Sequence, residues 1–255
     1  MLSEADLTRY ARQAILPELG EEGQERLLAS RVLVIGAGGL GSPVIALLAA
    51  AGIGELTICD GDAVELSNLN RQFIHSSTTL GENKADQAAS FASRLNPAIR
   101  TIAIPQMMNQ ASLADLLDGQ HMVLDCTDQM ASRQLIARAA RTAGIPHIFG
   151  GAVRMTGQLS VFMAGVPGHE DAACLGCLFP QQPGTDQAPN CAEAGILGPV
   201  VSVIGSLMAA EAVKLAAGLG GSMAGRLLLY DGQAVRFDEI GYSRQSDCPL
   251  CGVPG

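Results

Sequence analysis

A glycine-rich hexapeptide near the start of the chain constrains the fold more than any other stretch. GAGGLG, residues 36–41, follows the β-branched run Arg31–Ile35 and precedes the alanine-rich, helix-compatible segment Ser42–Ala51. Such a loop lets the backbone approach phosphate oxygens, and the helix N-terminus stabilises their charge. The next expected strand, Glu55–Asp60, ends in an acid placed to bind a ribose hydroxyl. The spacing predicts a nucleotide site formed by Asp60 and by the loop glycines Gly36, Gly38, Gly39 and Gly41.

Strands and helices alternate regularly as far as residue 153. Short apolar, β-branched runs are separated by helix-compatible segments, which is typical of βαβ units and a parallel sheet. We therefore expect an α/β fold with a Rossmann-like, doubly wound, mainly parallel sheet. After the elements above, the expected order is helix Lys84–Leu95, strand Arg100–Ile104, strand Met122–Cys126, helix Ser132–Ala143 and strand His147–Val153.

The pattern changes after residue 153. Three segments, QLSVFM, GRLLLYDG and AVRFDEI, look like antiparallel strands, and the apolar helix Pro199–Ala217 stands among them. The apolar run Ile196–Ala210 is too short for a membrane span, contains Pro199 and is followed by Glu211 and Lys214, so we expect a buried core helix. Gln181–Asn190 has the composition of a mobile loop. We expect one continuous domain with an N-terminal helical segment (1–30), a nucleotide-binding half (31–153) and a partner-binding half (154–255).

Composition narrows the class of protein. The 255 residues are 48% hydrophobic and carry a formal net charge of −9. Because phosphate affinity depends mainly on Lys and Arg, this balance argues against a general nucleic-acid binder or a binder of anionic membranes. The N-terminus, MLSEADLTRY, lacks the apolar core of a secretory signal. We expect a cytoplasmic protein whose seven cysteines are thiols or metal ligands.

The segment LSNLNRQF, residues 66–73, bears on which nucleotide binds. A triphosphate needs more cationic neutralisation than the pyrophosphate of NAD. Arg71 and Lys84 can supply it, and Asp128 follows a strand where a carboxylate can hold magnesium. Read one by one, these side chains also fit surface or helix-cap positions, so the prediction depends on their joint placement at strand ends. The candidate nucleotide-binding residues here are Asn68, Arg71, Gln72, Lys84 and Asp128, of which Asp128 is the candidate magnesium ligand.

Two C-x-x-C pairs predict a structural zinc site. Four thiolates at this spacing suit tetrahedral zinc and leave no open position for a catalytic water; a redox pair or chance is the alternative. Cys59 and Cys126 stand in expected strands as small core residues, whereas Cys191 precedes a helix where its pKa could be lowered, or it is an inert loop residue. The four histidines form no metal-binding motif. The expected zinc ligands are Cys174, Cys177, Cys248 and Cys251.

Several long segments resemble the MoeB/ThiF adenylyltransferases, the bacterial members of the ubiquitin-activating enzyme superfamily. The matching segments extend over nearly the whole chain. They are RYARQ (9–13), GAGGLG, DGDAVELSNLNRQF (60–73), GENK (81–84), LDCTDQ (124–129), GGAVRMTGQLSVF (150–162), the two C-x-x-C pairs and CAEAGILGPVVSVIGSLMAAEAVK (191–214).

The resemblance implies an enzyme that adenylates the C-terminal Gly-Gly carboxylate of a small ubiquitin-like sulfur carrier and releases pyrophosphate. Asp60 would bind the ATP ribose, Asn68, Arg71 and Lys84 the phosphates, and Asp128 the magnesium ion. Arg12 matches an arginine that reaches the phosphates of the neighbouring subunit, which implies a homodimer.

The resemblance also bears on three details. Cys191 matches a position at which ThiF-like members link covalently to their carrier. Gln129 stands where the family usually has Asn, which could shift a hydrogen bond beside the metal. The chain carries no rhodanese-like segment of the kind found in some relatives, so we expect the sulfur donor to be a separate sulfurtransferase.

Alternative functions remain open at this point. An NAD-dependent oxidoreductase would explain the glycine loop and Asp60, but it leaves Arg71, Lys84 and Asp128 without a role. A nucleotide-binding scaffold without activity is the second alternative. Within the enzyme class, molybdopterin and thiazole routes use carriers with the same Gly-Gly end. The GGAVRMTGQLSVF segment favours the molybdopterin branch.

Overall fold

One mixed sheet organises the fold. The computed structural model describes residues 1–180 and 194–252. Strands in these ranges follow the order β3-β2-β1-β4-β5-β6-β7-β8; pairing is parallel from β3 to β5 and antiparallel from β5 to β8. This confirms the predicted fold class. The bounds are β1 Arg31–Ile35, β2 Glu55–Cys59, β3 Arg100–Ile104, β4 Met122–Asp125, β5 His147–Val153, β6 Thr156–Phe162, β7 Arg226–Asp231 and β8 Arg236–Gly241.

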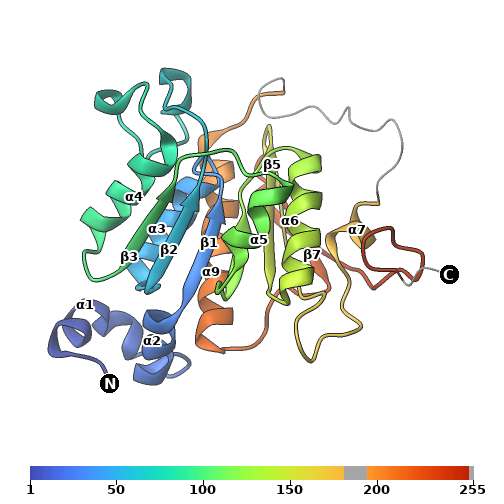
Figure 1. The fold of residues 1–255 in the computed structure, drawn as a ribbon, viewed down its shortest axis with the longest axis horizontal. Coiled ribbons are helices and arrows are strands. Elements are labelled where there is room, and N and C mark those ends of the chain that lie inside the picture. The colour runs from blue at the N-terminus through green and yellow to red at the C-terminus, as the bar shows by residue number, and fades with distance from the viewer. Residues whose placement is uncertain (181–193, 253–255) are drawn as a thin grey trace.

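Helices cover both faces of the parallel part (Figure 1). Apolar residues of α3, α4 and α9 pack on one face, and those of α5 and α6 pack on the other. The helix bounds are α1 Glu4–Ala14, α2 Gly20–Ala29, α3 Gly41–Ala51, α4 Lys84–Leu95, α5 Gln110–Leu117, α6 Met130–Ala143, α7 Leu175–Leu178 and α9 Gly198–Ala217, with short 3₁₀ turns η1 Leu66–Asn68 and η2 Ser77–Thr79.

Alternate residues of β1 explain this two-sided packing. Val32 and Val34 belong to the cluster beneath α3 and α9, whereas Leu33 and Ile35 belong to the cluster beneath α5 and α6. Since successive side chains of a strand point to opposite faces, a central strand covered on both sides must be apolar throughout. The run RVLVI meets that requirement and places the end of β1, where the glycine loop begins, in the middle of the sheet.

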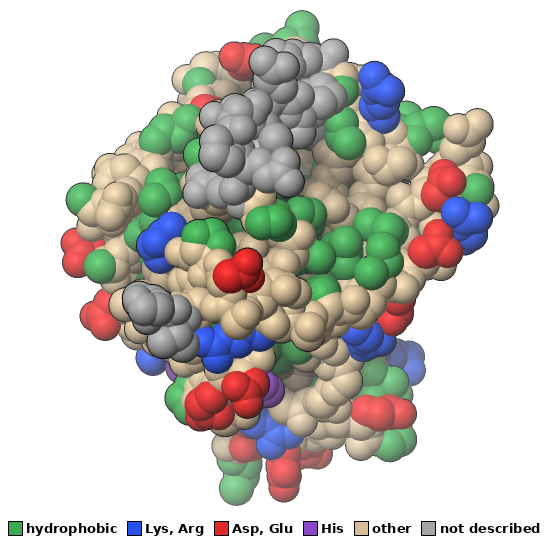
Figure 2. Space-filling view, turned by 90° about the vertical axis from the view of Figure 1, so that its right-hand side faces the viewer, with side chains coloured by type: hydrophobic (Ala, Val, Ile, Leu, Met, Phe, Trp, Pro, Cys, Tyr) green, Lys and Arg blue, Asp and Glu red, His purple; other side chains and the backbone are tan. Residues whose placement is uncertain are grey.

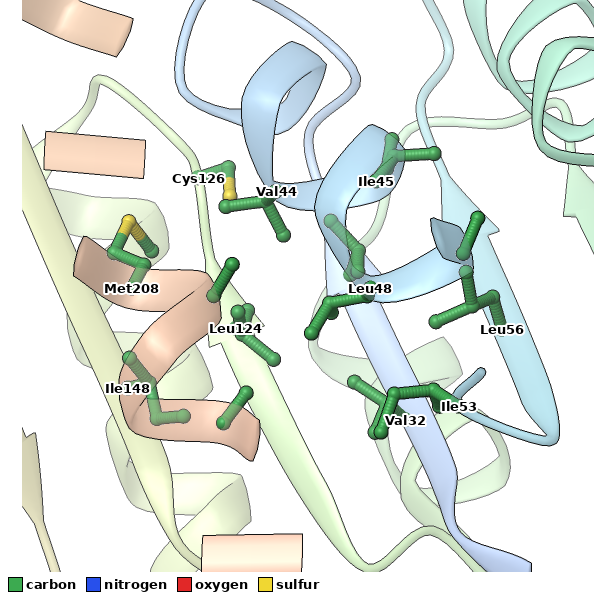
Figure 3. Packing of buried hydrophobic residues seen from close by; sticks show 14 of the residues in the cluster. Val32, Val44, Ile45, Leu48, Ile53, Leu56, Leu124, Cys126, Ile148 and Met208 are labelled. Atoms are coloured by element: carbon green, nitrogen blue, oxygen red, sulfur yellow. The ribbon is translucent and has the colours of Figure 1, made fainter. Parts of the chain in front are cut away.

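The long apolar helix α9 is a core element. Met208 of α9 and Leu48 of α3 point toward Leu124 and Ile148 of the sheet, in the cluster drawn in Figure 3. α9 also contacts α2, α3, β5 and β6. Within residues 1–180 and 194–252, it is the one helix long and apolar enough to cross a membrane. Its packing against these elements identifies it as the expected core helix.

The N-terminal helices are fixed to the core through buried polar contacts. Tyr10 of α1 is buried, and its hydroxyl accepts a hydrogen bond of 2.8 Å from Asn96 Nδ2. Gln24 of α2 is fully buried and donates to the Ala51 carbonyl at the end of α3. Buried polar groups that are paired in this way hold neighbouring elements in one arrangement.

The structure differs from the sequence-based expectation at some element ends. β4 ends at Asp125 instead of Cys126, and α6 begins at Met130 instead of Ser132. Helix α5 was missed; it begins after Asn109, whose side chain accepts hydrogen bonds from the backbone N–H groups of residues 111 and 112. Asn at such a position is a helix start signal, but eight residues give too weak a periodicity to indicate a helix.

Candidate nucleotide-binding site and cysteine cluster

The glycine loop connects the end of β1 to the start of α3. Gly36 has φ of 98°, and a Cβ added there would lie 2.8 Å from the carbonyl oxygen of Cys126. A Cβ on Gly41 would lie within 2.1 Å of the Gly36 carbonyl oxygen. Both positions therefore require glycine, one for its backbone conformation and one for close packing of the helix on the loop.

Asp60 follows β2 directly and is hydrogen-bonded through both carboxylate oxygens. Its Oδ2 accepts from the Ala37 backbone N–H at 2.7 Å, and its Oδ1 accepts from the Asp62 backbone N–H at 2.8 Å. Burial raises the pKa of Asp60 above its usual value, while these hydrogen bonds and the charge of Lys84 oppose the rise. The carboxylate is thus fixed against the glycine loop, where a ribose is expected.

A cavity of about 240 Å³ lies at the carboxyl ends of the parallel strands. In open α/β sheets, ligands bind at this edge. The cavity is lined by residues that are far apart in the sequence and come from the loops after β1, β2 and β4. The predicted residues that line it are Gly36, Gly38, Gly39, Asp60, Arg71, Gln72, Lys84 and Asp128.

The two predicted cations at this cavity differ in their hydrogen-bond partners. Lys84 begins α4, its side chain is 8% exposed, and its Nζ lies 2.9 Å from the Asp62 carboxylate. Arg71 is partly buried, and its Nη1 donates to the Ser67 carbonyl and the Asn70 side chain. Lys84 is therefore held by an opposite charge, whereas Arg71 is oriented by neutral acceptors and keeps its full charge for an anion.

Asp128 is exposed at the cavity and makes no hydrogen bond or ion pair with another described residue. Magnesium is commonly held by one or two carboxylates together with substrate phosphates and water. An unengaged carboxylate facing a cavity with two cations fits this coordination. Asp128 could therefore hold the metal, as the sequence predicts.

Gln72 presents a second unengaged group. The side chain is 5% exposed, and its Oε1 has no hydrogen-bond partner within the described part of the chain. A buried acceptor without a partner is costly, so its place at the cavity favours a ligand with a hydroxyl or amino donor. A nucleoside offers both kinds of group.

Three predicted residues do not line the cavity. Gly41 acts through loop packing, and Asn68 is buried with its Oδ1 accepting from the Glu65 backbone N–H at 3.3 Å. Arg12 is exposed in the last turn of α1 and also lies apart from the cavity. Asn68 therefore helps to hold the segment that carries Arg71, and Arg12 does not line the cavity of its own chain.

Sequence reasoning missed several residues at this site. Asp62 pairs with Lys84, and Met107 and Met108 form part of the cavity wall after β3. Arg133 also lines the cavity, through a guanidinium that is bonded to the Thr127 carbonyl. Asp62 stands in the same segment as Asp60 and could have been included, whereas an arginine inside a helix gives no signal that distinguishes it from a surface residue.

The four predicted cysteine ligands lie together. Their sulfur atoms are all within 4.8 Å of one another, with distances of 3.9 Å for Cys174–Cys177, 3.6 Å for Cys174–Cys248 and 3.4 Å for Cys177–Cys251. Tetrahedral zinc with Zn–S bonds of about 2.3 Å places its sulfurs about 3.8 Å apart. The cluster therefore has the size and ligand chemistry of a structural zinc site.

Backbone N–H groups point at two sulfurs of this cluster. The N–H groups of Gln245 and Leu250 point at the sulfurs of Cys177 and Cys248, each at 3.4 Å. Burial opposes ionisation of Cys248, but hydrogen bonds, first from Leu250 and then from Cys251, lower its pKa to about 7. Burial raises the pKa of Cys174 and of Cys251, so Cys248 ionises more readily than these two ligands.

Two further predictions fall on residues outside the described ranges. The Gln181–Asn190 loop and Cys191 lie in the segment 181–193, which the structure does not describe. Their expected roles therefore stay predictions.

Sequence relatives match this chain over nearly its whole length. The chain is 42% identical to a sulfur carrier protein adenylyltransferase of Thermus thermophilus, over 97% of this chain and 91% of that protein. It is 40% identical to a molybdopterin-synthase adenylyltransferase of Escherichia coli, over 98% of each. It is 43% identical to mouse adenylyltransferase and sulfurtransferase MOCS3, over 98% of this chain and 54% of that protein, so it spans about half of this longer relative.

A solved structure shares this fold, and a family model matches the sequence. E. coli MccB superposes with a TM-score of 0.83 at 22% identity, over 96% of this chain and 72% of that chain. At that identity the likeness concerns the fold alone. The sequence profile of the ThiF family matches residues 10–250. The chain therefore belongs to the ThiF family.

Proposed function

We propose that this chain is an ATP-dependent adenylyltransferase that activates the C-terminal Gly-Gly carboxylate of a small ubiquitin-like sulfur carrier and releases pyrophosphate. One observation carries the proposal: a single cavity combines the glycine loop and Asp60 with two cations, Arg71 and Lys84, and the unengaged carboxylate of Asp128. A site for NAD would need the first two features only. The named relatives act as adenylyltransferases by their descriptions, which supports the same activity here.

The chemistry needs charge neutralisation more than proton transfer. A carboxylate is ionised at pH 7, so its oxygen attacks the α-phosphorus without a general base while the bond to the pyrophosphate oxygen breaks. Arg71 and Lys84 would stabilise the departing negative charge. A group of this kind typically lowers the activation barrier by about 3–4 kcal/mol. Magnesium bound at Asp128 would supply additional positive charge at the phosphates.

We assign the sulfur carrier to the antiparallel end of the sheet. All six residues of β8 are exposed, and Phe237 and Ile240 have 48% and 49% of their surface open. Figure 2 shows hydrophobic side chains gathered into a patch on this side of the molecule, bordered by acidic and basic groups. Exposed apolar patches of this kind are typical of protein interaction sites. An extended Gly-Gly tail can then pass close to the backbone toward the cavity.

The remaining assignments follow the same reasoning. The molybdopterin branch is favoured because an E. coli molybdopterin-synthase adenylyltransferase matches over 98% of both chains, with a thiazole-type carrier as the alternative. The cysteine cluster would hold a structural zinc ion.

Because Arg12 lies apart from its own cavity, we propose a homodimer in which it reaches the site of the partner. A separate sulfurtransferase would supply the sulfur, and we place the protein in the cytoplasm.

Pyrophosphate exchange tests the proposal. The purified protein is incubated with ATP, magnesium and labelled pyrophosphate, together with a molybdopterin-type or a thiazole-type carrier whose Gly-Gly tail is intact or deleted. Exchange that requires the tail supports carboxylate adenylation, and the carrier that gives the higher rate identifies the branch. Absence of exchange with both carriers, from protein that binds ATP, would favour a nucleotide-binding scaffold.

A further inference from the structure

A fully buried carboxylate stands directly behind the nucleotide cavity. Asp125 ends β4, is 0% exposed and forms an in-register pair with Ile35 of β1 on one side and Phe149 of β5 on the other. Its side chain does not line the cavity. Burying an ionised carboxylate is costly unless hydrogen bonds and opposite charge compensate, so its partners are informative.

Asp125 and Arg133 hold the Thr127 residue from opposite sides. Asp125 Oδ1 accepts from the Thr127 backbone N–H at 3.0 Å and from its hydroxyl at 2.7 Å. Arg133 Nη2 donates to the Thr127 carbonyl oxygen at 2.8 Å, and the guanidinium packs over the Phe149 ring at 4.9 Å. Thr127 is therefore fixed at its N–H, its hydroxyl and its carbonyl. A buried anion and a buried cation, which balance each other, make these contacts.

His147 orients the Asp125 carboxylate. It begins β5, is 2% exposed, and its Nε2 lies 3.3 Å from Asp125 Oδ2. Its Nδ1 is buried without a partner among the described residues, so Nε2 is the ring nitrogen that engages the carboxylate. The Nε2–H then donates to the carboxylate. Although burial alone would raise the pKa of Asp125, the bond from His147 and the nearby positive charge hold it below its usual value.

We propose that His147 and Asp125 are positioning residues for the metal-binding carboxylate of Asp128. The residue after the fixed Thr127 is Asp128, whose side chain makes no hydrogen bond or ion pair with another described residue. The geometry of that carboxylate therefore depends on the backbone at Thr127, and this backbone is held by Asp125 and its partner His147. This inference rests on the proposed function in one respect: it takes the bound ligand to be a metal–nucleotide complex.

Substitutions of His147 can test whether its hydrogen-bond donor positions Asp125 and, through Thr127, Asp128. His147→Leu introduces a branched apolar side chain of similar size without a hydrogen-bond donor, so the buried carboxylate loses one partner and can rotate away from Thr127. His147→Gln places an amide Nε2–H near the position of the imidazole Nε2–H. Groups that orient metal ligands typically change metal affinity by about 10- to 100-fold when they are removed.

The measurement is Mn²⁺ binding, followed by electron paramagnetic resonance in the presence of α,β-methylene-ATP. We expect His147→Leu to bind Mn²⁺ at least about tenfold more weakly than the parent chain, and His147→Gln to stay within about threefold. Asp128→Ala sets the signal for loss of the ligand itself, and His169→Gln, at an exposed histidine, is the matched control. Asp125→Asn is nearly isosteric and should weaken binding as His147→Leu does, which keeps the test valid where the leucine variant fails to fold.

The outcomes separate this inference from the proposed function. Equal weakening by His147→Leu and His147→Gln, or no weakening by either, overturns the positioning role whatever the exchange activity. Selective weakening by His147→Leu supports it even where no carrier gives pyrophosphate exchange, a result that would count against the proposed function alone. A parent chain that binds no Mn²⁺ with the nucleotide analogue overturns both.

Discussion

The ammonium of Lys84 lies 2.9 Å from the carboxylate of Asp62 at the rim of the nucleotide cavity. The two partners differ in burial, because the Lys84 side chain is 8% exposed and that of Asp62 is 52% exposed. An incoming phosphate therefore competes with Asp62 for a cation that is already in place. Phosphate binding is therefore weakened by the free energy that is needed to break the Lys84–Asp62 ion pair.

Asp62→Asn should lower the KM for ATP. The amide has the same size but does not carry the competing charge, and an ion pair with an exposed partner contributes up to about 1 kcal/mol, which corresponds to a decrease of up to about fivefold. The measurement is exchange rate against ATP concentration, with Asp86→Asn on the exposed side of α4 as the control. A KM that is unchanged or higher would contradict the competition.

Asp128→Ala should abolish most activity without affecting the fold. The carboxylate is exposed and makes no contact with described residues, so the free energy of unfolding should change by less than about 0.5 kcal/mol. Loss of the metal ligand should lower the exchange rate by about 100- to 1,000-fold. Exchange assays and urea denaturation of the same preparation measure both quantities. A rate near that of the parent chain would exclude Asp128 as the metal ligand.

The cysteine cluster should bind one zinc ion per chain. Cys248→Ser removes one of four ligands and should release zinc and lower the melting temperature, whereas Cys59→Ser, at a buried cysteine outside the cluster, should retain the metal. Because the ligands bind as thiolates, zinc retention should also fall as the pH is lowered. Elemental analysis after gel filtration measures the zinc content. Parent protein that is purified without chelators and lacks zinc would contradict the site.

His75 should make stability depend on pH. Its Nε2 lies 2.9 Å from the Ala37 carbonyl oxygen in the glycine loop, and burial, only partly opposed by this bond, lowers its pKa. Near pH 6 the unfolded chain therefore binds more protons than the folded chain. The free energy of unfolding should fall as the pH decreases from about 6.5, by at most about 1.4 kcal/mol per pH unit.

His75→Gln isolates this contribution. The amide can still donate to the Ala37 carbonyl but does not titrate, so urea denaturation at pH 7.5 and pH 5.5 should show a smaller loss of stability for the variant than for the parent chain. An identical loss in both proteins would assign the pH dependence to other groups.

Arg12 should act on the site of a neighbouring subunit. Arg12→Ala and Asp128→Ala are each expected to be inactive, because each homodimer lacks one component of both composite sites. Subunits exchanged between the two variants form hybrid dimers with one complete site, so a random mixture should regain about a quarter of the parent activity. Exchange assays on co-refolded variants measure this recovery. If the mixture stays inactive, Arg12 acts within its own chain or has no role in the reaction.

Local sequence patterns predicted the fold well where an element has its own signal. The glycine loop and Asp60 were identified because close backbone packing and a strand end impose specific residue types. The cysteine spacing gave the ligand cluster for the same reason. The buried contacts of Asp125, His147 and Arg133 around Thr127 were missed. Strand order and register bring this carboxylate, imidazole and helical arginine together. Nothing in the sequence near these residues indicates that contact.

The cysteine cluster has a consequence for the unfolded chain. Cys174 and Cys248 are 74 positions apart in the sequence, and a metal ion held by all four sulfurs would close the intervening segment, which includes α9, β7 and β8, into a loop. Loop closure restricts the conformations open to an unfolded chain, by about 4 kcal/mol for a loop of this length on a chain-entropy estimate. Loss of the metal would therefore favour early opening of the antiparallel end, while the parallel part keeps its own core.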